Sequence, residues 1–530
     1  MRFVQDNLRS ADDMITITSL ALPSTLPPDR FVEWFRLAIM HLRFHHPILA
    51  VSIRTGLLPN LLIPALMYEP GTIADLDAWA AQFVQVHTPQ DETMPMADRV
   101  EQLRRTLGLT VLDVEQCAKR VHLVLPGRPD EANVVAVLVH TAHSISDAHT
   151  ELVMMRRALE LAGEYASAPY PLPRNHPLHP ATLPWGTEHK NLIPCMHDLV
   201  GVPIDSYNQE DGISEALRVL SGYSLLIKPA HTPTHYALCE TKRANFVLSV
   251  ADTARLRVAA KAHGLTMTQI VDASRYIAMM ETNRTYLESG APRKETLHVN
   301  FLLPYNIRPL VQNFSGDLLG CLSSGFTTVM PLNMPYFVPA TQEKNKPLHE
   351  LDQVRSLVRV ASNLAKQYHE RRNRIHAQLR AQMPLLLMGG MLGPYYPKLA
   401  SAPEGFSSVG VVDALLPAEI PTPGGDPTRV TDWRLGMLMS DHEASLHFSM
   451  HIWTRVNQLH VSVMHTEDYA DALVQGYLDV MRETLLLFAQ AYEESHQLIE
   501  PSPMRELPAP KVVEQTTELS EADTNGNVKT

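Results

Sequence analysis

The sequence predicts an α/β protein of two lobes, each a mixed β-sheet flanked by helices. The chain has 530 residues, which is far more than one small core needs. Apolar runs typical of buried strands are interspersed along it with segments whose apolar residues recur at helical spacing. A stretch containing Pro229 and Pro233 leads from the first half to the second. We therefore expect lobes at residues 1–230 and 231–498, and a disordered polar tail at 499–530.

The composition argues against several classes of protein. Hydrophobic residues make up 45% of the chain and charged residues 19%, as in globular proteins. The net charge of −12 argues against nucleic acid or an anionic membrane as a partner. The sequence contains no apolar stretch of about 18 residues that could span a membrane, and its first residues lack the apolar core of a secretory signal. We expect a cytoplasmic protein whose four scattered cysteines are reduced thiols.

Strands and helices are interspersed in the first half. Its predicted elements are strands at 14–20, 49–54, 121–125 and 133–140 and helices at 30–44, 73–86, 96–107 and 148–166. The helix at 30–44 should end before Pro47, because proline forces the preceding chain into an extended form.

The chain from Val134 to Thr150 is the centre of this half. Val134–Val139 is apolar without alternation, which is typical of a strand buried on both faces. From Glu151 onward apolar residues recur at helical spacing. His143 and Asp147 therefore fall in a turn that is anchored by a buried strand before it and a helix after it. Reactive groups are commonly placed in such turns.

The second half repeats this mixture of elements. We expect a strand at 246–250, a helix that begins at 251 and ends at Gly264, a helix at 267–284, a strand that runs from 298 into a polar turn with Arg308, and a long helix at 351–382. Strands at 437–438, 444–453 and 459–465 should form an antiparallel meander, followed by a last helix at 469–494.

One short segment carries a resemblance to a known family. Ala142–Ala148, which reads Ala-His-Ser-Ile-Ser-Asp-Ala, resembles the HxxxD signature of the CoA-dependent acyltransferase superfamily. That superfamily includes chloramphenicol acetyltransferase, alcohol acyltransferases and the condensation domains of nonribosomal peptide synthetases. Condensation domains usually carry HHxxxDG, and the flanking Ala142 and Ala148 depart from that pattern. The resemblance implies two chloramphenicol acetyltransferase-like lobes with the active site in a tunnel between them.

Within this superfamily the order of segments over about residues 14–495 is most similar to fungal alcohol acetyltransferases of the trichothecene 15-O-acetyltransferase group. The Asp-Phe-Gly-Trp-Gly motif of the plant branch is absent, since Asp432–Gly436 is a poor substitute. The resemblance implies an O-acyltransferase that moves an acyl group, with acetyl expected first, from acyl-CoA to a hydroxyl of a secondary metabolite such as a terpenoid or polyketide. Acyl-CoA would be a co-substrate, with no bound cofactor or metal, and the chain is expected to be a monomer.

The resemblance also implies roles for individual residues. His143 would be the general base, a role that suits histidine because its pKa lies near the working pH, and no acyl-enzyme would form. Asp147 would point away from the substrate and form a structural salt bridge to an arginine of the second lobe, for which Arg308 is the candidate. Ser407 and Ser408 precede Val-Gly and resemble a Ser-Asn-x-Gly segment near the oxyanion, with Ser408 in the place of the asparagine.

Other interpretations compete with this one. His140, His143, Asp147 and His149 have spacings that could ligate zinc, but side chains that leave a strand need not converge. Residues 405–410 are one position out of register for the Gly-x-Ser-x-Gly elbow of serine hydrolases. Two further alternatives stay open: a condensation-type enzyme with an acyl carrier protein as donor, and a catalytically inactive relative that acts as a binding module.

Overall fold

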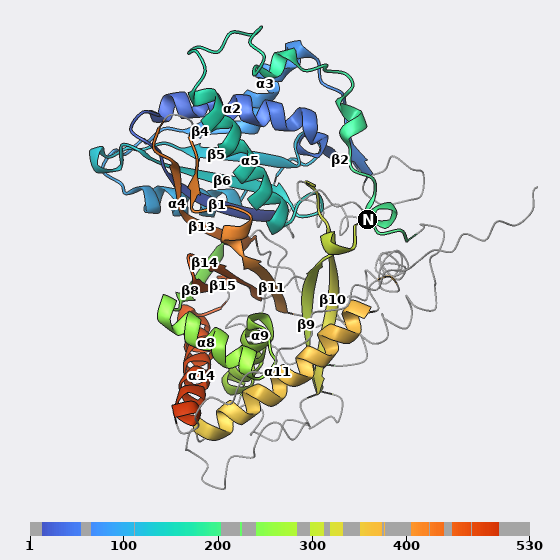
Figure 1. Ribbon diagram of the computed structural model, residues 1–530, viewed down its shortest axis with the longest axis vertical. Coiled ribbons are helices and arrows are strands. Elements are labelled where there is room, and N and C mark those ends of the chain that lie inside the picture. Colours follow the sequence, from blue (N-terminus) through green and yellow to red (C-terminus); the bar gives the residue numbers. More distant parts are fainter. Residues whose placement is uncertain are drawn as a thin grey trace, which may run out of the picture.

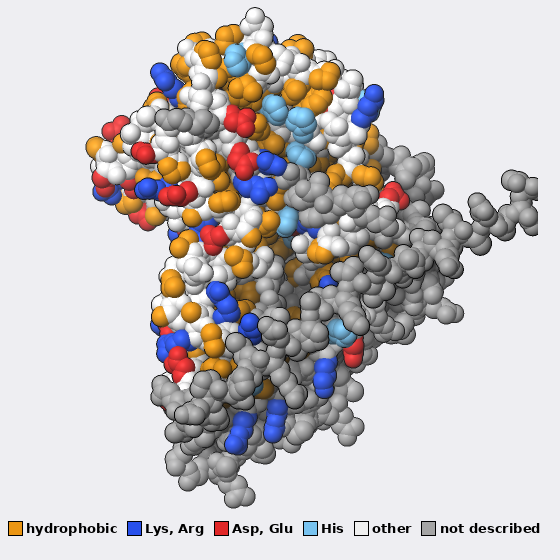
Figure 2. Space-filling model, viewed as in Figure 1, with side chains coloured by type: hydrophobic (Ala, Val, Ile, Leu, Met, Phe, Trp, Pro, Cys, Tyr) orange, Lys and Arg blue, Asp and Glu red, His pale blue; other side chains and the backbone are white. Residues whose placement is uncertain are grey.

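The computed structural model has the two lobes that the sequence predicts, stacked along the long axis of the molecule (Figure 1). It describes residues 13–54, 65–110, 112–202, 223–224, 240–283, 297–311, 318–331, 350–373, 376, 404–422, 425–438, 448–467 and 469–497. The predicted tail at 499–530 lies outside the described residues. On the left of the space-filling view the surface narrows where the two lobes meet (Figure 2).

The first lobe is built on a six-stranded sheet with the order β12-β13-β1-β6-β5-β4. Its strands are β1 (Asp13–Ala21), β4 (Val84–His87), β5 (Lys119–Val124), β6 (Val134–Ala142), β12 (Glu419–Ile420) and β13 (Thr428–Met437). Only β4 and β5 pair in parallel; the other neighbours are antiparallel, so the sheet is mixed. Three further short elements occur before residue 203. The strands β2 (Ser52–Arg54) and β3 (Ala65–Met67) form a separate two-stranded sheet, and α6 (Met196–Leu199) is a short helix.

Helices cover both faces of this sheet. They are α2 (Pro28–His45), α3 (Ile73–Phe83), α4 (Met96–Gly108) and α5 (Ala148–Ala166). Val135, Val137 and Val139 of β6 share a core with α2, α3 and α5, whereas Ala136 and Leu138 pack with α4. Successive strand residues point to opposite faces, so an uninterrupted apolar run is what a strand between two helical layers requires.

The second lobe is built on a seven-stranded sheet with the order β10-β9-β11-β14-β15-β8, and β7 pairs with β9. Its strands are β7 (Tyr223–Ser224), β8 (Thr241–Val247), β9 (Leu297–Asn306), β10 (Ser323–Pro331), β11 (Glu404–Val411), β14 (Phe448–Arg455) and β15 (Gln458–Thr466). The helices are α8 (Val250–Ala262), α9 (Met267–Thr282), α11 (Glu350–Asn373) and α14 (Asp471–Gln497). β11 lies parallel to both β9 and β14, which makes this sheet mixed as well.

Residues 419–437 lie in the first lobe, although the predicted boundary places them in the second. The sequence places all of 231–498 in the second lobe, but β12 and β13 belong to the sheet of the first. β13 runs antiparallel to β1, from Met14 opposite Met437 to Ala21 opposite Arg429. The predicted meander is therefore wrong in part, since only β14 and β15 form a hairpin. The pairing covers the edge of β1 that β6 leaves open, and local sequence carries no signal for a partner more than 400 positions away.

Local capping residues account for several helix ends. Asp147, Ser249 and Thr266 are the N-caps of α5, α8 and α9, and each side chain accepts a hydrogen bond from the first turn. Gly264 has φ +68°, a conformation that favours glycine, and it follows the end of α8 as predicted. None of the helices in the described ranges combines the length and apolar character needed to cross a bilayer.

Candidate active site

A cavity of about 480 Å³ lies between the two lobes. The first lobe contributes the end of β6, the turn after it and part of β1 and β13, and the second contributes β9, β10, β11 and β14. Much of the lining is apolar, including Met14, Ile53, Phe406, Leu435 and Met437. Its size falls in the range of about 300–1,000 Å³ that is usual for small-molecule sites. This cavity is where the predicted site residues meet.

The turn that carries His143 is held at both ends. Ile145 N–H donates to the carbonyl of Ala142, at the end of β6. Asp147 begins α5, and its Oδ1 accepts from Thr150 N–H at 2.9 Å. The backbone of the turn is therefore fixed by the strand that it leaves and by the helix that it enters.

The side chain of His143 has a defined tautomer. Its Nδ1 lies 2.8 Å from the carbonyl oxygen of Ser146. A carbonyl can only accept, so Nδ1 carries the proton and Nε2 carries the lone pair in the neutral ring. His143 also lines the cavity. The arrangement leaves Nε2 as the basic nitrogen of this side chain.

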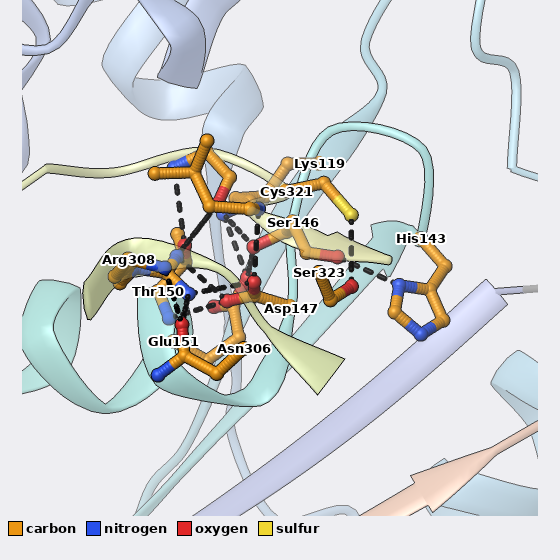
Figure 3. Close-up of polar contacts among 12 residues, drawn as sticks. Lys119, His143, Ser146, Asp147, Thr150, Glu151, Asn306, Arg308, Cys321 and Ser323 are labelled. Carbon is orange, nitrogen blue, oxygen red and sulfur yellow. Dashed lines mark hydrogen bonds and ion pairs between the residues drawn. The ribbon is translucent and has the colours of Figure 1, made fainter. Parts of the chain in front are cut away.

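A buried polar cluster, which sequence reasoning missed, supports the turn (Figure 3). Lys119 Nζ lies 2.7 Å from Glu151 Oε1 and 3.1 Å from Ser146 Oγ, and Ser146 Oγ donates to Glu151. The Lys119 and Glu151 side chains are 2% and 0% exposed. Buried charges persist where they are paired and hydrogen-bonded. This pair holds Ser146, whose carbonyl in turn orients His143.

Asp147 makes an ion pair with Arg308 across the two lobes. Arg308 Nη1 donates to Asp147 Oδ2 at 2.8 Å and Nη2 donates to Oδ1 at 2.9 Å. Arg308 is 1% exposed, and its Nη2 also donates to the carbonyl of Gly320 at 2.8 Å. Leu322 N–H donates to Asp147 Oδ2 at 3.0 Å.

The Asp147 carboxylate is thus held by hydrogen-bond donors on both oxygens. Burial raises its pKa, but the charge and hydrogen bonds of Arg308 outweigh burial, so the pKa lies below its usual range. In Figure 3 the ring of His143 lies apart from this carboxylate. Asp147 is accordingly placed to hold the turn and the two lobes together, and not to exchange a proton with His143.

Cys321 was also missed as a site residue, and it influences His143. Its Sγ lies 3.5 Å from Ser323 Oγ, and Ser323 lines the cavity. Burial lowers the pKa of His143, but the contact with Cys321 and the carbonyl of Ser146 outweigh burial and raise it to about 10. His143 therefore keeps its proton to a higher pH than an ordinary histidine does.

The side chains of Ser407 and Ser408, which are consecutive in β11, have different surroundings. Ser408 Oγ lies 2.8 Å from Thr268 Oγ1 of α9, which holds its hydroxyl. Ser407 pairs with His451 of the parallel strand β14, so both side chains lie on the same face of the sheet. The pairing is irregular between Ser408 and Gly410, where Gly410 has φ +87°, and bulges of this kind are common beside active sites.

The candidate zinc ligands do not converge. His140 Nε2 lies 3.0 Å from Asp13 Oδ2, and Asp147 is paired with Arg308. No group of three or more His, Cys, Asp or Glu side chains with a metal-binding arrangement occurs in the described part of the chain.

The two lobes and the cavity between them define the fold of this protein. The chain has the fold shared by the CoA-dependent acyltransferases and the condensation domains of peptide and polyketide synthetases, as the resemblance implied. No model of a sequence family matches it, and no curated protein sequence matches it.

Among solved structures it is similar to the trichothecene 15-O-acetyltransferase TRI3 of Fusarium sporotrichioides. The TM-score is 0.72, with 17% identity over 92% of this chain and 93% of that one. It is also similar to the epimerization domain from the third module of tyrocidine synthetase B (TM-score 0.56, 13% identity, 92% and 95% covered). The condensation domain of the monacolin K polyketide synthase MokA gives a TM-score of 0.55 (12% identity, 92% and 96% covered). At these identities the likeness concerns the fold.

Proposed function

We propose that this protein is an O-acyltransferase that moves an acyl group from acyl-CoA to a hydroxyl of a secondary metabolite such as a terpenoid or polyketide. Acetyl is the acyl group that we expect first. The observation that carries the proposal is the placement of His143. Its imidazole lines the cavity between the lobes, and its Nδ1 donates to the backbone at 2.8 Å. In the neutral form of the ring, which becomes more populated as the pH approaches its pKa of about 10, Nε2 is the base.

The proposed reaction needs no covalent intermediate on the protein. His143 Nε2 takes the proton of the acceptor hydroxyl as the oxygen attacks the thioester carbonyl. The tetrahedral intermediate then collapses, and the same nitrogen returns the proton to the departing thiolate of CoA. General acid–base help of this kind is typically worth about 10²–10⁴ in rate. Ser407, on the second-lobe face of the cavity, is the better placed of the two proposed oxyanion donors, because the hydroxyl of Ser408 is held by Thr268.

The lining of the cavity supports an apolar acceptor. Met14, Leu435 and Met437 come from the first sheet, and Ile53 and Phe406 add further apolar surface. Methionine side chains adapt to ligands of varied shape. Such a lining suits a terpenoid or polyketide skeleton that presents one hydroxyl to His143.

An acyl carrier protein is the alternative donor. The same fold occurs in condensation domains, and this favours the alternative. Ala142 and Ala148, which replace the flanking His and Gly of HHxxxDG, favour free acyl-CoA. A catalytically inactive relative with a binding role is the remaining candidate, and the intact His143 and Asp147 argue against it.

The test is an assay of thiol release with acetyl-CoA against a panel of hydroxylated terpenoids and polyketides, with product detection by mass spectrometry. We expect acceptor-dependent release of CoA and a product heavier by one acetyl group. Acetyl loaded on a carrier protein serves as the competing donor. His143→Ala is the matched variant, and turnover equal to that of the parent would refute the role of this histidine.

Three further expectations accompany this function. We propose that the protein acts as a monomer, without a bound cofactor, and in the cytoplasm. Sedimentation of the purified chain at several concentrations tests the first, and elemental and small-molecule analysis of the purified protein tests the second. Microscopy of a tagged copy in the producing cell tests the third.

A further inference from the structure

His451 is a buried side chain that lines the cavity, and nothing in the sequence points to a role for it. It lies on β14, the strand between β11 and β15. Phe448, Met450 and Ile452 of this strand belong to the core under the helices of the second lobe. Because strand residues alternate, Ser449 and His451 point to the opposite face, and both line the cavity.

The ring of His451 has an unpaired nitrogen. The side chain is 2% exposed, and its Nδ1 has no hydrogen-bond partner among the described residues. A buried N–H without an acceptor costs more than a lone pair without a donor, so the proton of the neutral ring belongs on Nε2. Because Nδ1 is buried and His451 lines the cavity, we infer that Nε2 is the nitrogen that faces the cavity.

The two histidines of the cavity differ in protonation. Burial lowers the pKa of His451, repulsion from His143 lowers it further, and the value is about 3. The pKa of His143 is raised to about 10. Environments that push the pKa values of two neighbouring groups apart commonly mark different roles in acid–base chemistry. His451 therefore stays neutral over the physiological range, and a ring with so low a pKa is too weak a base to replace His143.

We propose that His451 is a second catalytic residue, whose Nε2–H donates a hydrogen bond to the thioester carbonyl oxygen as that oxygen becomes negatively charged. The inference rests on the proposed acyl transfer. The acceptor oxygen forms the new bond to the carbonyl carbon, its proton passes to His143, and the carbonyl electron pair moves onto the oxygen facing His451. When the carbonyl re-forms, the bond to sulfur breaks and His143 protonates the thiolate. Ser407 of β11 pairs with His451 of β14, so it is adjacent to the proposed site of this oxygen.

A preorganised donor to an oxyanion is typically worth about 10²–10³ in kcat. His451→Phe keeps a ring of similar size and removes the donor, and His451→Gln restores an N–H donor. His122 offers a matched control, since it is 3% exposed, its pKa is also lowered to about 3, and its Nε2 is likewise unpaired among the described residues. It lies on β5, away from the residues that line the cavity.

The experiment measures kcat and KM for acetyl-CoA at saturating acceptor in His451→Phe, His451→Gln and His122→Phe, with thermal unfolding of each protein. We expect kcat of His451→Phe to fall about 100-fold with little change in KM, and His451→Gln to recover part of the loss. His122→Phe should keep the parent kcat per folded molecule. Four outcomes would each overturn the proposal. They are a normal kcat in His451→Phe, a change in that variant confined to KM, an equal loss of kcat in His122→Phe, and a kcat of His451→Gln no higher than that of His451→Phe.

A second measurement does not depend on turnover. Imidazole ¹⁵N spectra of the full chain, with His451→Phe for assignment, should show His451 as the neutral Nε2–H tautomer from pH 5 to pH 8. The Nδ1–H tautomer or a titration in this range would refute the inference. If the parent protein releases no CoA from acetyl-CoA with any acceptor, the proposed function itself fails, and that result is distinct from a normal rate in the His451 variants.

Discussion

Replacing Asp147 by alanine should lower the free energy of unfolding by about 4–6 kcal/mol, which is the sum of two losses. The guanidinium of Arg308, 1% exposed, would stay buried without its carboxylate. Leaving one partner of a buried ion pair in place costs about 3–5 kcal/mol. Asp147 is also the N-cap of α5, and losing a cap costs about 1 kcal/mol.

Arg308→Ala should be less damaging. The carboxylate of Asp147 would keep the N–H groups of Thr150 and Leu322 as donors. The double variant should lose less than the sum of the two single losses, because no charge is then left without its partner. Urea unfolding followed by circular dichroism gives the three values.

The control is the exposed pair of Arg128 and Asp130, whose side chains are 36% and 63% exposed. Asp130→Ala should change stability by less than about 1 kcal/mol, since such pairs contribute little. Single losses at Asp147 and Arg308 as small as the control, or a double variant that is fully additive, would show that this contact does not hold the lobes together.

The pH dependence of the same variants follows from the lowered pKa of Asp147. A carboxyl whose pKa is lower in the folded state contributes stability above its ordinary value of 3.8, and this contribution is lost as the pH falls through the folded value. The stability difference between the parent and Asp147→Asn should therefore shrink below about pH 4. A difference that stays constant to pH 2 would contradict the assignment.

The remaining predictions concern the residues around the cavity. His143→Ala should lower kcat by about 10²–10⁴ with the unfolding midpoint unchanged. A large fall in the unfolding midpoint would indicate a structural role instead. Because Cys321 raises the pKa of His143, to about 10 overall, kcat/KM should rise with pH toward that value, since only the neutral ring is a base. Cys321→Ala should move this rising limb to lower pH, and an unmoved limb counts against the contact. Lys119→Met should leave Glu151 buried without its charged partner, and we expect urea unfolding to show a loss of about 3–5 kcal/mol in unfolding free energy. Ser407→Ala should reduce kcat more than Ser408→Ala does, and the opposite order would place the oxyanion on the other side of β11.

The sequence by itself determined the elements around the turn that carries His143. The apolar run of β6, the capping residue Asp147 and the helical spacing after it are signals spread over a few neighbouring positions. They place His143 between a buried strand and a helix without reference to any other part of the chain. The ends of α8 and α9 are predictable for the same reason, since Ser249, Gly264 and Thr266 act on the backbone next to them.

Only the tertiary structure decided what faces the cavity. The alternation at 448–452 places Ser449 and His451 on one face, but the helices on the other side of β14 decide that this face meets the cavity. The pairing of β13 with β1 and the contact of Lys119 with Glu151 join segments far apart in sequence. Many strands offer equivalent edges, and a buried cation could pair with any of several carboxylates. Which strands and which charges pair therefore depends on the packing of the whole chain, and the neighbouring residues in the sequence do not indicate it.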